Sequence, residues 1–130
     1  MKARAAKATV AWPVEIRMVK GRCALQVAFE DGTVFHLPAE LLRVTSPSAE
    51  VQGHSEAQRK TFGGKRHVRI LSVDPVGNHA VRLGFDDMHA TEIHSWAFLH
   101  DLGVNVERLF KEYLDDLQSK GLDRDRPGVK

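Results

Sequence analysis

Three short segments near the start of the chain alternate apolar and polar residues, and a tight-turn signal separates each from the next. The segments are residues 14–18, 25–29 and 34–37. Lys20-Gly21 and Asp31-Gly32 lie between them, and glycine and aspartate tolerate the positive φ that a tight hairpin requires. Alternation with a period of two places one face of each strand in a core. The pattern therefore predicts a three-stranded antiparallel meander.

Alternating apolar residues return in the second half of the chain. They cover residues 68–72 and 81–85, with a turn cluster at 74–78 between them. A short strand is expected near residues 91–93, after the Asp86-Asp87 turn. These segments predict a second β-hairpin unit that pairs its strands by the same alternation.

Helical segments are expected at four places. One is a turn that Ser46 caps, with Pro47 at its first position, and that stops near Gly53. Residues 38–44 begin with a proline and should form one or two turns. Ser95 should cap a helix that Gly103 ends, and Asn105 should cap a last helix whose apolar residues share one face. The predicted fold class is α+β, with an antiparallel meander, a second hairpin unit, short helices and an amphipathic C-terminal helix.

The two ends of the chain differ from its middle. Residues 1–11 place three basic side chains among alanines, and residues 123–130 are polar and contain a proline and a glycine. Such ends are often poorly ordered. We therefore expect a flexible basic tail over residues 1–11, one domain over residues 12–122 and a flexible tail over residues 123–130.

Composition narrows the classes of function. Apolar residues make up 42% and charged residues 28% of the chain, as in an ordinary globular protein. The net charge of +2 is lower than a general nucleic-acid binder usually carries. No apolar run is long enough to cross a bilayer, and the single cysteine, Cys23, excludes an internal disulfide. These features favour a cytoplasmic protein without a membrane partner.

The densest basic region lies between the two β units. Residues 52–67 are polar, contain glycines and lack periodicity, which predicts a long exposed loop. Gly63-Gly64 could present N–H groups to an anion. We predict that this loop is an interaction surface, and the alternative is weak binding of RNA or a phosphate ligand through residues 59–69. The predicted surface residues are Arg59, Lys60, Lys65, Arg66 and His67.

No constellation of catalytic or metal-binding residues is evident. Asp86 and Asp87 would point to opposite faces of a strand, and Cys23 has no evident base beside it. A metal site needs three or four converging ligands, and the sequence has no spaced cluster of cysteines and histidines. We expect neither catalysis nor a cofactor. The alternative is zinc or iron binding, with His89, His54 and His94 as candidate ligands.

Several separated motifs, taken in order, resemble the gamma-butyrobetaine hydroxylase-like N-terminal domain family. The resemblance covers roughly residues 13–122. It implies a compact α+β domain that occurs alone in bacteria, ahead of the oxygenase domain in carnitine-synthesis hydroxylases, and attached to some iron–sulfur cluster carrier ATPases. The motifs are Leu37 to Glu50, Gly64-Lys65-Arg66, Pro75-Val76-Gly77-Asn78, Phe85-Asp86-Asp87 with His89, and Ser95-Trp96.

The resemblance also allows the zinc ligands of the relatives to be compared with the matching positions in this chain. In the hydroxylases this domain carries a zinc ion held by three cysteines and one histidine. The matching positions here are Ser46, Ser48 and Val51 for the cysteines and His89 for the histidine. Serine is a poor zinc ligand at neutral pH and valine is none, so the zinc site of these relatives is expected to be lost.

These observations together predict a non-catalytic accessory module that binds a protein partner. By resemblance, the expected setting is iron–sulfur cluster assembly, with an assembly factor or a carrier ATPase as the partner. That expectation rests on domain association. The sequence gives no ligand set that would support it directly.

Overall fold

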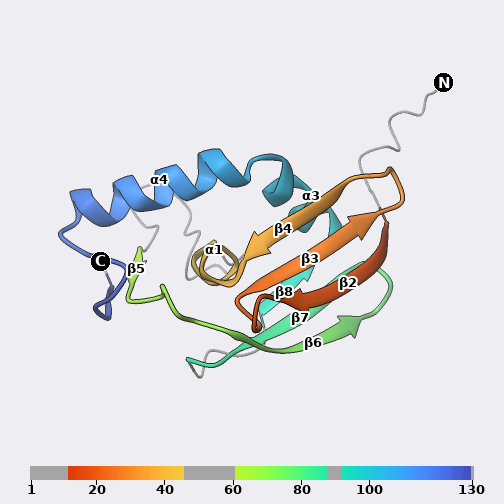
Figure 1. The fold of residues 1–130 in the computed structure, drawn as a ribbon, viewed down its shortest axis with the longest axis horizontal. Coiled ribbons are helices and arrows are strands. Elements are labelled where there is room, and N and C mark those ends of the chain that lie inside the picture. The colour runs from red at the N-terminus through yellow and green to blue at the C-terminus, as the bar shows by residue number, and fades with distance from the viewer. Residues whose placement is uncertain (1–11, 46–60, 88–91, 130) are drawn as a thin grey trace.

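The structure, a computed structural model, describes residues 12–45, 61–87 and 92–129. It confirms the α+β class (Figure 1). Predictions for residues 1–11, 46–60, 88–91 and 130 lie outside the described residues. The strands are β2 (Pro13–Val19), β3 (Ala24–Phe29), β4 (Val34–Pro38), β5 (Phe62–Gly63), β6 (Ile70–Val76), β7 (Ala80–Phe85), β8 (Glu92–Ser95) and β9 (Gly128–Val129). The helices are α1 (Ala39–Val44), α3 (Trp96–Val104) and α4 (Val106–Ser119).

The predicted meander is confirmed. β2, β3 and β4 form an antiparallel sheet in that order, with Ile16 opposite Val27 and Val27 opposite Phe35. Gly32 has a φ of +92° in the second turn, which is the conformation that the Asp31-Gly32 pair predicted. The alternation in the sequence therefore fixes the register of this sheet.

The second sheet has the order β6-β7-β8, and one boundary within it was predicted wrongly. β6 runs on through Pro75 to Val76, and the turn begins only at Gly77. Pro75 is tolerated because β6 is an edge strand, where the missing N–H can face away from the neighbour. The predicted turn at 74–78 therefore begins three residues too early.

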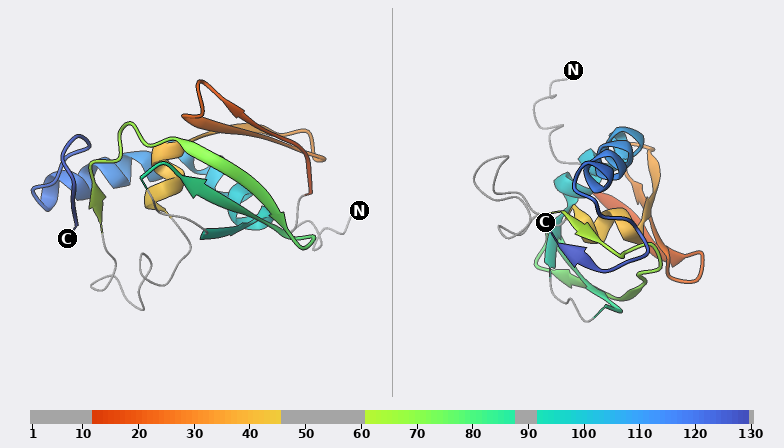
Figure 2. Two further views of the ribbon diagram at one scale, coloured as in Figure 1. Left: turned by 90° about the horizontal axis from the view of Figure 1, so that it is seen from below. Right: turned by 90° about the vertical axis from the view of Figure 1, so that its left-hand side faces the viewer.

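The core lies between the two sheets and the helices. The most buried side chains come from both sheets and from α1, and they include Leu25, Leu37, Leu41 and Leu83. All six residues of α1 are buried. α4 runs along one side of the molecule beside α1, as the views in Figures 1 and 2 show. None of the helices in the described ranges is long and apolar enough to cross a membrane.

Helix α3 confirms one predicted boundary and corrects another. The Ser95 hydroxyl accepts a hydrogen bond from the N–H of Phe98, so Ser95 is the expected cap. Gly103, predicted to end the helix, lies inside it and packs against the ring of Phe35, where a side chain would collide. Asn105 does not cap α4 with its side chain, which donates to the carbonyl oxygen of Asp101 instead.

The segment after α4 also differs from its prediction as a flexible tail. Gly121 has a φ of +71° and turns the chain back toward α1. The chain then pairs as β9 with β5, with Phe62 opposite Val129 and Gly63 opposite Gly128. Residues 123–129 therefore belong to the folded domain.

One side-chain cluster links the β3–β4 hairpin to α3. Asp31 accepts hydrogen bonds from the hydroxyl and N–H of Thr33 and lies 2.9 Å from the His100 ring. The hydrogen bond from the Thr33 hydroxyl is the main cause that lowers the pKa of Asp31 from 3.8 to about 2. The charged carboxylate is therefore favoured in the folded state.

Asp31→Asn should lower stability near neutral pH and matter less in acid. A lowered folded pKa adds stability above about pH 4, and this contribution disappears as the pH falls toward about 2. The effect should be small because the side chain is 43% exposed. Urea unfolding of both proteins at pH 6 and pH 2 would measure it, and a difference that does not shrink at pH 2 would contradict this account.

Candidate functional site

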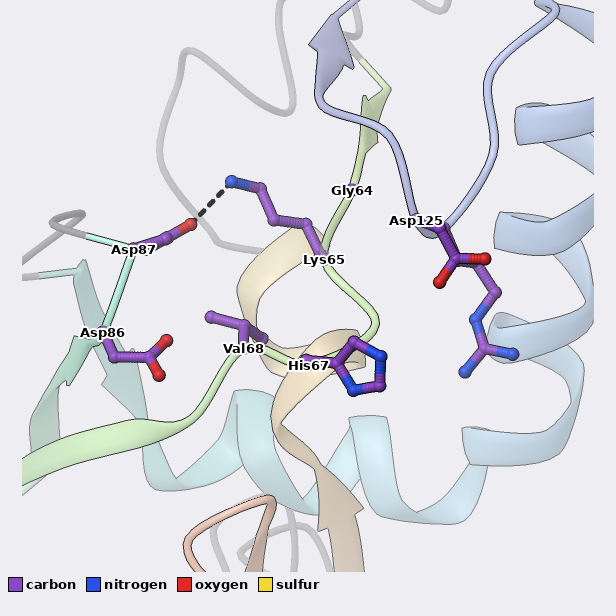
Figure 3. A pocket seen from close by; sticks show the side chains of 8 residues that line it. Gly64, Lys65, His67, Val68, Asp86, Asp87 and Asp125 are labelled. Atoms are coloured by element: carbon purple, nitrogen blue, oxygen red, sulfur yellow. Dashed lines mark hydrogen bonds and ion pairs between the residues drawn. The ribbon is translucent and has the colours of Figure 1, made fainter.

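One open pocket of about 250 Å³ gathers charged residues from three distant parts of the chain. They come from the turn after β5, the turn after β7 and the segment between α4 and β9 (Figure 3). We call this the charged pocket. Its lining residues are Gly64, Lys65, His67, Val68, Asp86, Asp87, Arg124 and Asp125.

At one side of the charged pocket, Asp87 is shared by two basic residues. The Lys65 ammonium group donates to Asp87 Oδ2 at 2.6 Å, as Figure 3 shows, and Arg43 Nε donates to the same oxygen at 2.9 Å. The side chain of Arg43 is only 7% exposed and its guanidinium lies over the Phe62 ring. Arg43 Nη1 is buried with no hydrogen-bond partner among the described residues. Asp87 is therefore a structural partner of α1.

At the other side, the segment between α4 and β9 holds the turn after β5 in place. Arg66 donates two hydrogen bonds to the Asp125 carboxylate, at 2.6 and 3.2 Å. The Gly64 N–H donates to the carbonyl oxygen of Asp123, and the Arg66 N–H donates to that of Arg124. The hydrogen bonds from Arg66 lower the pKa of Asp125. The turn is thus held by both main-chain and side-chain contacts.

The main chain of Pro127 comes so close to this turn that position 64 requires glycine. Its φ is +74°, and a side-chain carbon at this position would lie 2.7 Å from the main chain of Pro127. Glycine is the residue that accepts both conditions. The Gly64-Lys65-Arg66 motif therefore has a local physical reason that does not involve a ligand.

Behind the pocket, a buried carboxylate anchors the same segment. Glu40 of α1 is 5% exposed and accepts two hydrogen bonds from Arg124, at 2.7 and 2.8 Å. The Tyr113 hydroxyl of α4 donates to it at 2.6 Å. Burial, followed by the hydrogen bond to Glu40, raises the pKa of Tyr113, and the bond to Glu40 raises the pKa of Arg124. The three side chains join α1, α4 and the C-terminal segment.

The two adjacent aspartates have separate structural roles. Asp86 accepts the N–H of Arg69 and closes the turn after β7, whereas Asp87 bonds Arg43 and Lys65. Two carboxylates employed in this way do not form an acid/base pair. Both residues lie in the turn after β7.

Size and lining limit what the charged pocket can bind. Sites for small ligands usually enclose about 300–1,000 Å³ and are mainly apolar. This pocket is smaller and open, and five of its eight lining residues are charged. Within residues 12–45, 61–87 and 92–129, no group of three or more histidine, cysteine, aspartate or glutamate side chains is placed to hold a metal ion.

The structure places the predicted site residues in different parts of the molecule. Lys65 and His67 line the charged pocket, and Arg66 pairs with its lining residue Asp125. His94 is fully buried on β8, with its ring 5.6 Å from that of Phe98, and does not lie at the pocket. The remaining predicted residues lie outside the described residues, and they are Arg59, Lys60, His54, His89, Ser46, Ser48 and Val51.

Four residues of the site were missed from the sequence. Glu40 and Arg43 lie on a short helix whose polar residues would ordinarily be assigned to solvent, and Arg124 and Asp125 lie in a segment predicted to be a tail. One signal was available. The alternating charges of Asp123 to Arg126 could match the basic residues at 65–66, but local patterning cannot show which distant segment they meet.

Comparison with known proteins places the chain among relatives of the same fold. The sequence profile described as "Gamma-butyrobetaine hydroxylase-like, N-terminal" matches residues 16–100. No protein of curated function is similar enough to count as a match.

Three solved structures are similar along most of their length. Two are solution structures determined by NMR. One is 37% identical with a TM-score of 0.76, and covers 89% of this chain and 91% of that chain. The other is 36% identical with a TM-score of 0.77, and covers 95% and 90%. A crystal structure of a DUF971 family protein of unknown function from Acidithiobacillus ferrooxidans ATCC 23270 is 35% identical with a TM-score of 0.54, and covers 70% and 91%.

Proposed function

The chain belongs to the gamma-butyrobetaine hydroxylase-like N-terminal family, and we propose that it is a non-catalytic cytoplasmic module that binds a protein partner. The binding surface is the rim of the charged pocket, where Arg66 and His67 project beside Asp125. Lys65 contributes its charge from a less exposed position, because its side chain is 18% exposed.

The observation that carries this proposal is that hydrogen bonds hold the backbone of the turn after β5 while charged side chains at this turn are exposed. Main-chain bonds from Gly64 and Arg66 hold the turn, while the side chains of Arg66 and Asp125 are 39% and 58% exposed. His67 is exposed beside them. A surface that is already ordered loses less conformational entropy when a partner binds. This arrangement supports specific contact better than a mobile basic loop would.

The charges indicate the chemistry of the partner. Each exposed cation at the rim has a carboxylate of the same chain nearby, so the surface alternates in sign. A complementary partner would offer carboxylates to Arg66 and His67 and a cation to Asp125 or Asp86. We propose iron–sulfur cluster assembly as the setting, with an assembly factor or carrier ATPase as the partner, because the family resemblance associates the domain with such ATPases.

The two alternatives gain little support from the described residues. For anion or RNA binding, the Gly64 N–H would have to be available, but it donates to Asp123. Lys65 and Arg66 are each paired with a carboxylate, which weakens the positive potential that phosphates need. For metal binding, His94 would have to reach a site, but it is buried beside Phe98.

A pair of variants tests the proposal by affinity capture from the native host. Arg66→Gln with His67→Glu should abolish capture of the partner, because it changes the exposed Arg66 and His67 side chains without touching buried Arg43 or Glu40. Arg108→Gln with Lys111→Glu introduces the same two residue types on the exposed face of α4 and should leave capture unchanged.

The captured protein would then be purified and titrated against each variant by calorimetry. Equal affinity for the wild-type chain and the pocket variant would contradict the proposal. An RNA titration at two salt concentrations and metal analysis of freshly purified protein cover the alternatives. Strongly salt-dependent RNA binding or stoichiometric metal would replace the proposal with the corresponding alternative.

A further inference from the structure

The first sheet ends in an open edge at β2. Among the described residues β2 has one strand neighbour, β3, and it lies on the opposite margin of the sheet from β4 (Figure 1). The Glu15 and Arg17 side chains are 52% and 57% exposed. Val14 is 66% exposed and Met18 38% exposed, although both are apolar. An exposed edge with apolar residues is a template for pairing with another strand.

Hydrogen bonds of β3 show which main-chain groups of β2 face outward. The Phe29 N–H donates to the Thr33 carbonyl, and the Cys23 carbonyl accepts from the Ala39 N–H. The main-chain N–H and carbonyl groups of the odd-numbered residues of β3 therefore point toward β4. The main-chain groups of the even-numbered residues of β3 therefore point toward β2, in agreement with the hydrogen bond from the Glu30 N–H to the Trp12 carbonyl.

The register carries this alternation over to β2. Ala28 lies opposite Glu15 and Gln26 lies opposite Arg17, so these two residues of β2 use their main-chain groups inside the sheet. Neighbouring residues of a strand point these groups in opposite directions. Ile16 and Met18 therefore direct an N–H and a carbonyl toward the open edge.

The sequence of β2 complements itself when it is reversed. Around Ile16, an acidic residue precedes at Glu15 and a basic residue follows at Arg17, flanked by Val14 and Met18. In an antiparallel pair centred on Ile16, Glu15 of each copy meets Arg17 of the other. Val14 meets Met18, and Ile16 meets its own counterpart. Opposite charges placed across strands stabilise such a pair, whereas like charges destabilise it.

We propose that two copies of this chain associate through antiparallel β2–β2 pairing about a two-fold axis at Ile16. The pairing joins the two three-stranded sheets into one continuous six-stranded sheet. Ile16, whose main-chain groups face outward, forms the hydrogen-bonded pair at the centre, and the ion pairs occupy the closer non-hydrogen-bonded positions on either side. The register shift between Pro13 and Glu15 marks where regular pairing ends.

The charge pattern favours a second copy over an unrelated extended peptide. Any extended peptide could form hydrogen bonds with the open main-chain groups. Only a strand that places a basic residue opposite Glu15, an apolar residue opposite Ile16 and an acidic residue opposite Arg17 matches both charges. β2 itself has that order when reversed. An isologous contact of this kind closes after two copies and does not propagate.

Charge reversal at the two positions tests the pairing. Glu15→Arg gives each strand two cations, and Arg17→Glu gives each strand two anions. Each variant alone should sediment as a monomer at concentrations from about 10 µM to about 1 mM, where the wild-type chain forms a dimer of twice the single-chain mass. Mixing the two variants in equal amounts should restore the dimer, because the opposite charges then meet across the strands.

A double variant and a surface control complete the experiment. The combined Glu15→Arg, Arg17→Glu chain reverses both charges and should dimerise like the wild type. Arg108→Glu changes an equally exposed ion pair on α4 and should not affect the mass. A wild-type chain that remains monomeric at the highest concentration, or variants that dimerise alone as well as when mixed, would overturn the proposal.

Discussion

Replacing Arg124 by alanine should lower the free energy of unfolding by about 3 kcal/mol. The substitution removes two hydrogen bonds from Glu40, which is 5% exposed, and leaves its carboxylate in the interior with the Tyr113 hydroxyl as its remaining hydrogen-bond donor among the described side chains. A buried charge without its counterion is costly, whereas a well-formed pair costs little. Urea unfolding at neutral pH would measure the difference.

Two further variants distinguish this cause from a general effect of truncation. Arg126→Ala removes an exposed arginine from the same segment and should change stability by less than about 0.5 kcal/mol. Glu40→Gln added to Arg124→Ala removes the uncompensated charge and should recover part of the loss. Equal losses for Arg124→Ala and Arg126→Ala would contradict the role of the Glu40 pair.

Asp87→Ala should also cost about 3 kcal/mol, although Asp87 lies at the pocket. Asp87 Oδ2 accepts bonds from Lys65 and from Arg43, whose side chain is 7% exposed. Without this carboxylate a buried guanidinium and a largely buried ammonium group lie near each other. Thermal and urea unfolding would detect the loss, and adding Arg43→Met should recover stability by removing the buried charge.

The neighbouring aspartate is the matched control for this prediction. Asp86→Ala removes an exposed carboxylate that accepts one main-chain N–H, from Arg69, and should cost about 1 kcal/mol. If Asp86→Ala proves as destabilising as Asp87→Ala, the loss belongs to the turn itself and the proposed role of Arg43 is wrong.

Sequence patterning predicted the sheets because strand alternation and turn chemistry are local. The register of the first sheet follows from the alternation in residues 14–37. The ends of helices and strands were less predictable where contacts with distant residues determine them. Pro75 is tolerated on an edge strand, and Gly103 is held inside α3 by its contact with Phe35. Neither neighbour can be identified from a local window of sequence.

The folded C-terminal segment was missed for a similar reason. Its polar composition is that of a mobile tail, but Arg124 is held by a carboxylate of α1 84 positions earlier. The pairing of β9 with β5 involves only two residues on each side and leaves no periodic signal. Contacts of such high sequence separation decided both the fold of this segment and one wall of the charged pocket.

For the candidate site, the sequence identified Lys65, Arg66 and His67 but not the residues that they contact. Lys65, Arg66 and His67 lie where the basic loop was expected to meet a ligand, yet the structure pairs two of them with carboxylates. The resemblance places the positions of the relatives' zinc ligands after Arg43 and after Asp87, and these two residues are joined by an ion pair at 2.9 Å.

Site-directed photo-crosslinking in the native host tests the central claim most directly. A photoreactive amino acid replaces His67 in one strain and Lys111, on the exposed face of α4, in another. We predict one discrete protein adduct from position 67 that is absent from position 111. Identical adducts from both positions, or none from position 67 in cells that contain the folded protein, would contradict a partner-binding role for this surface.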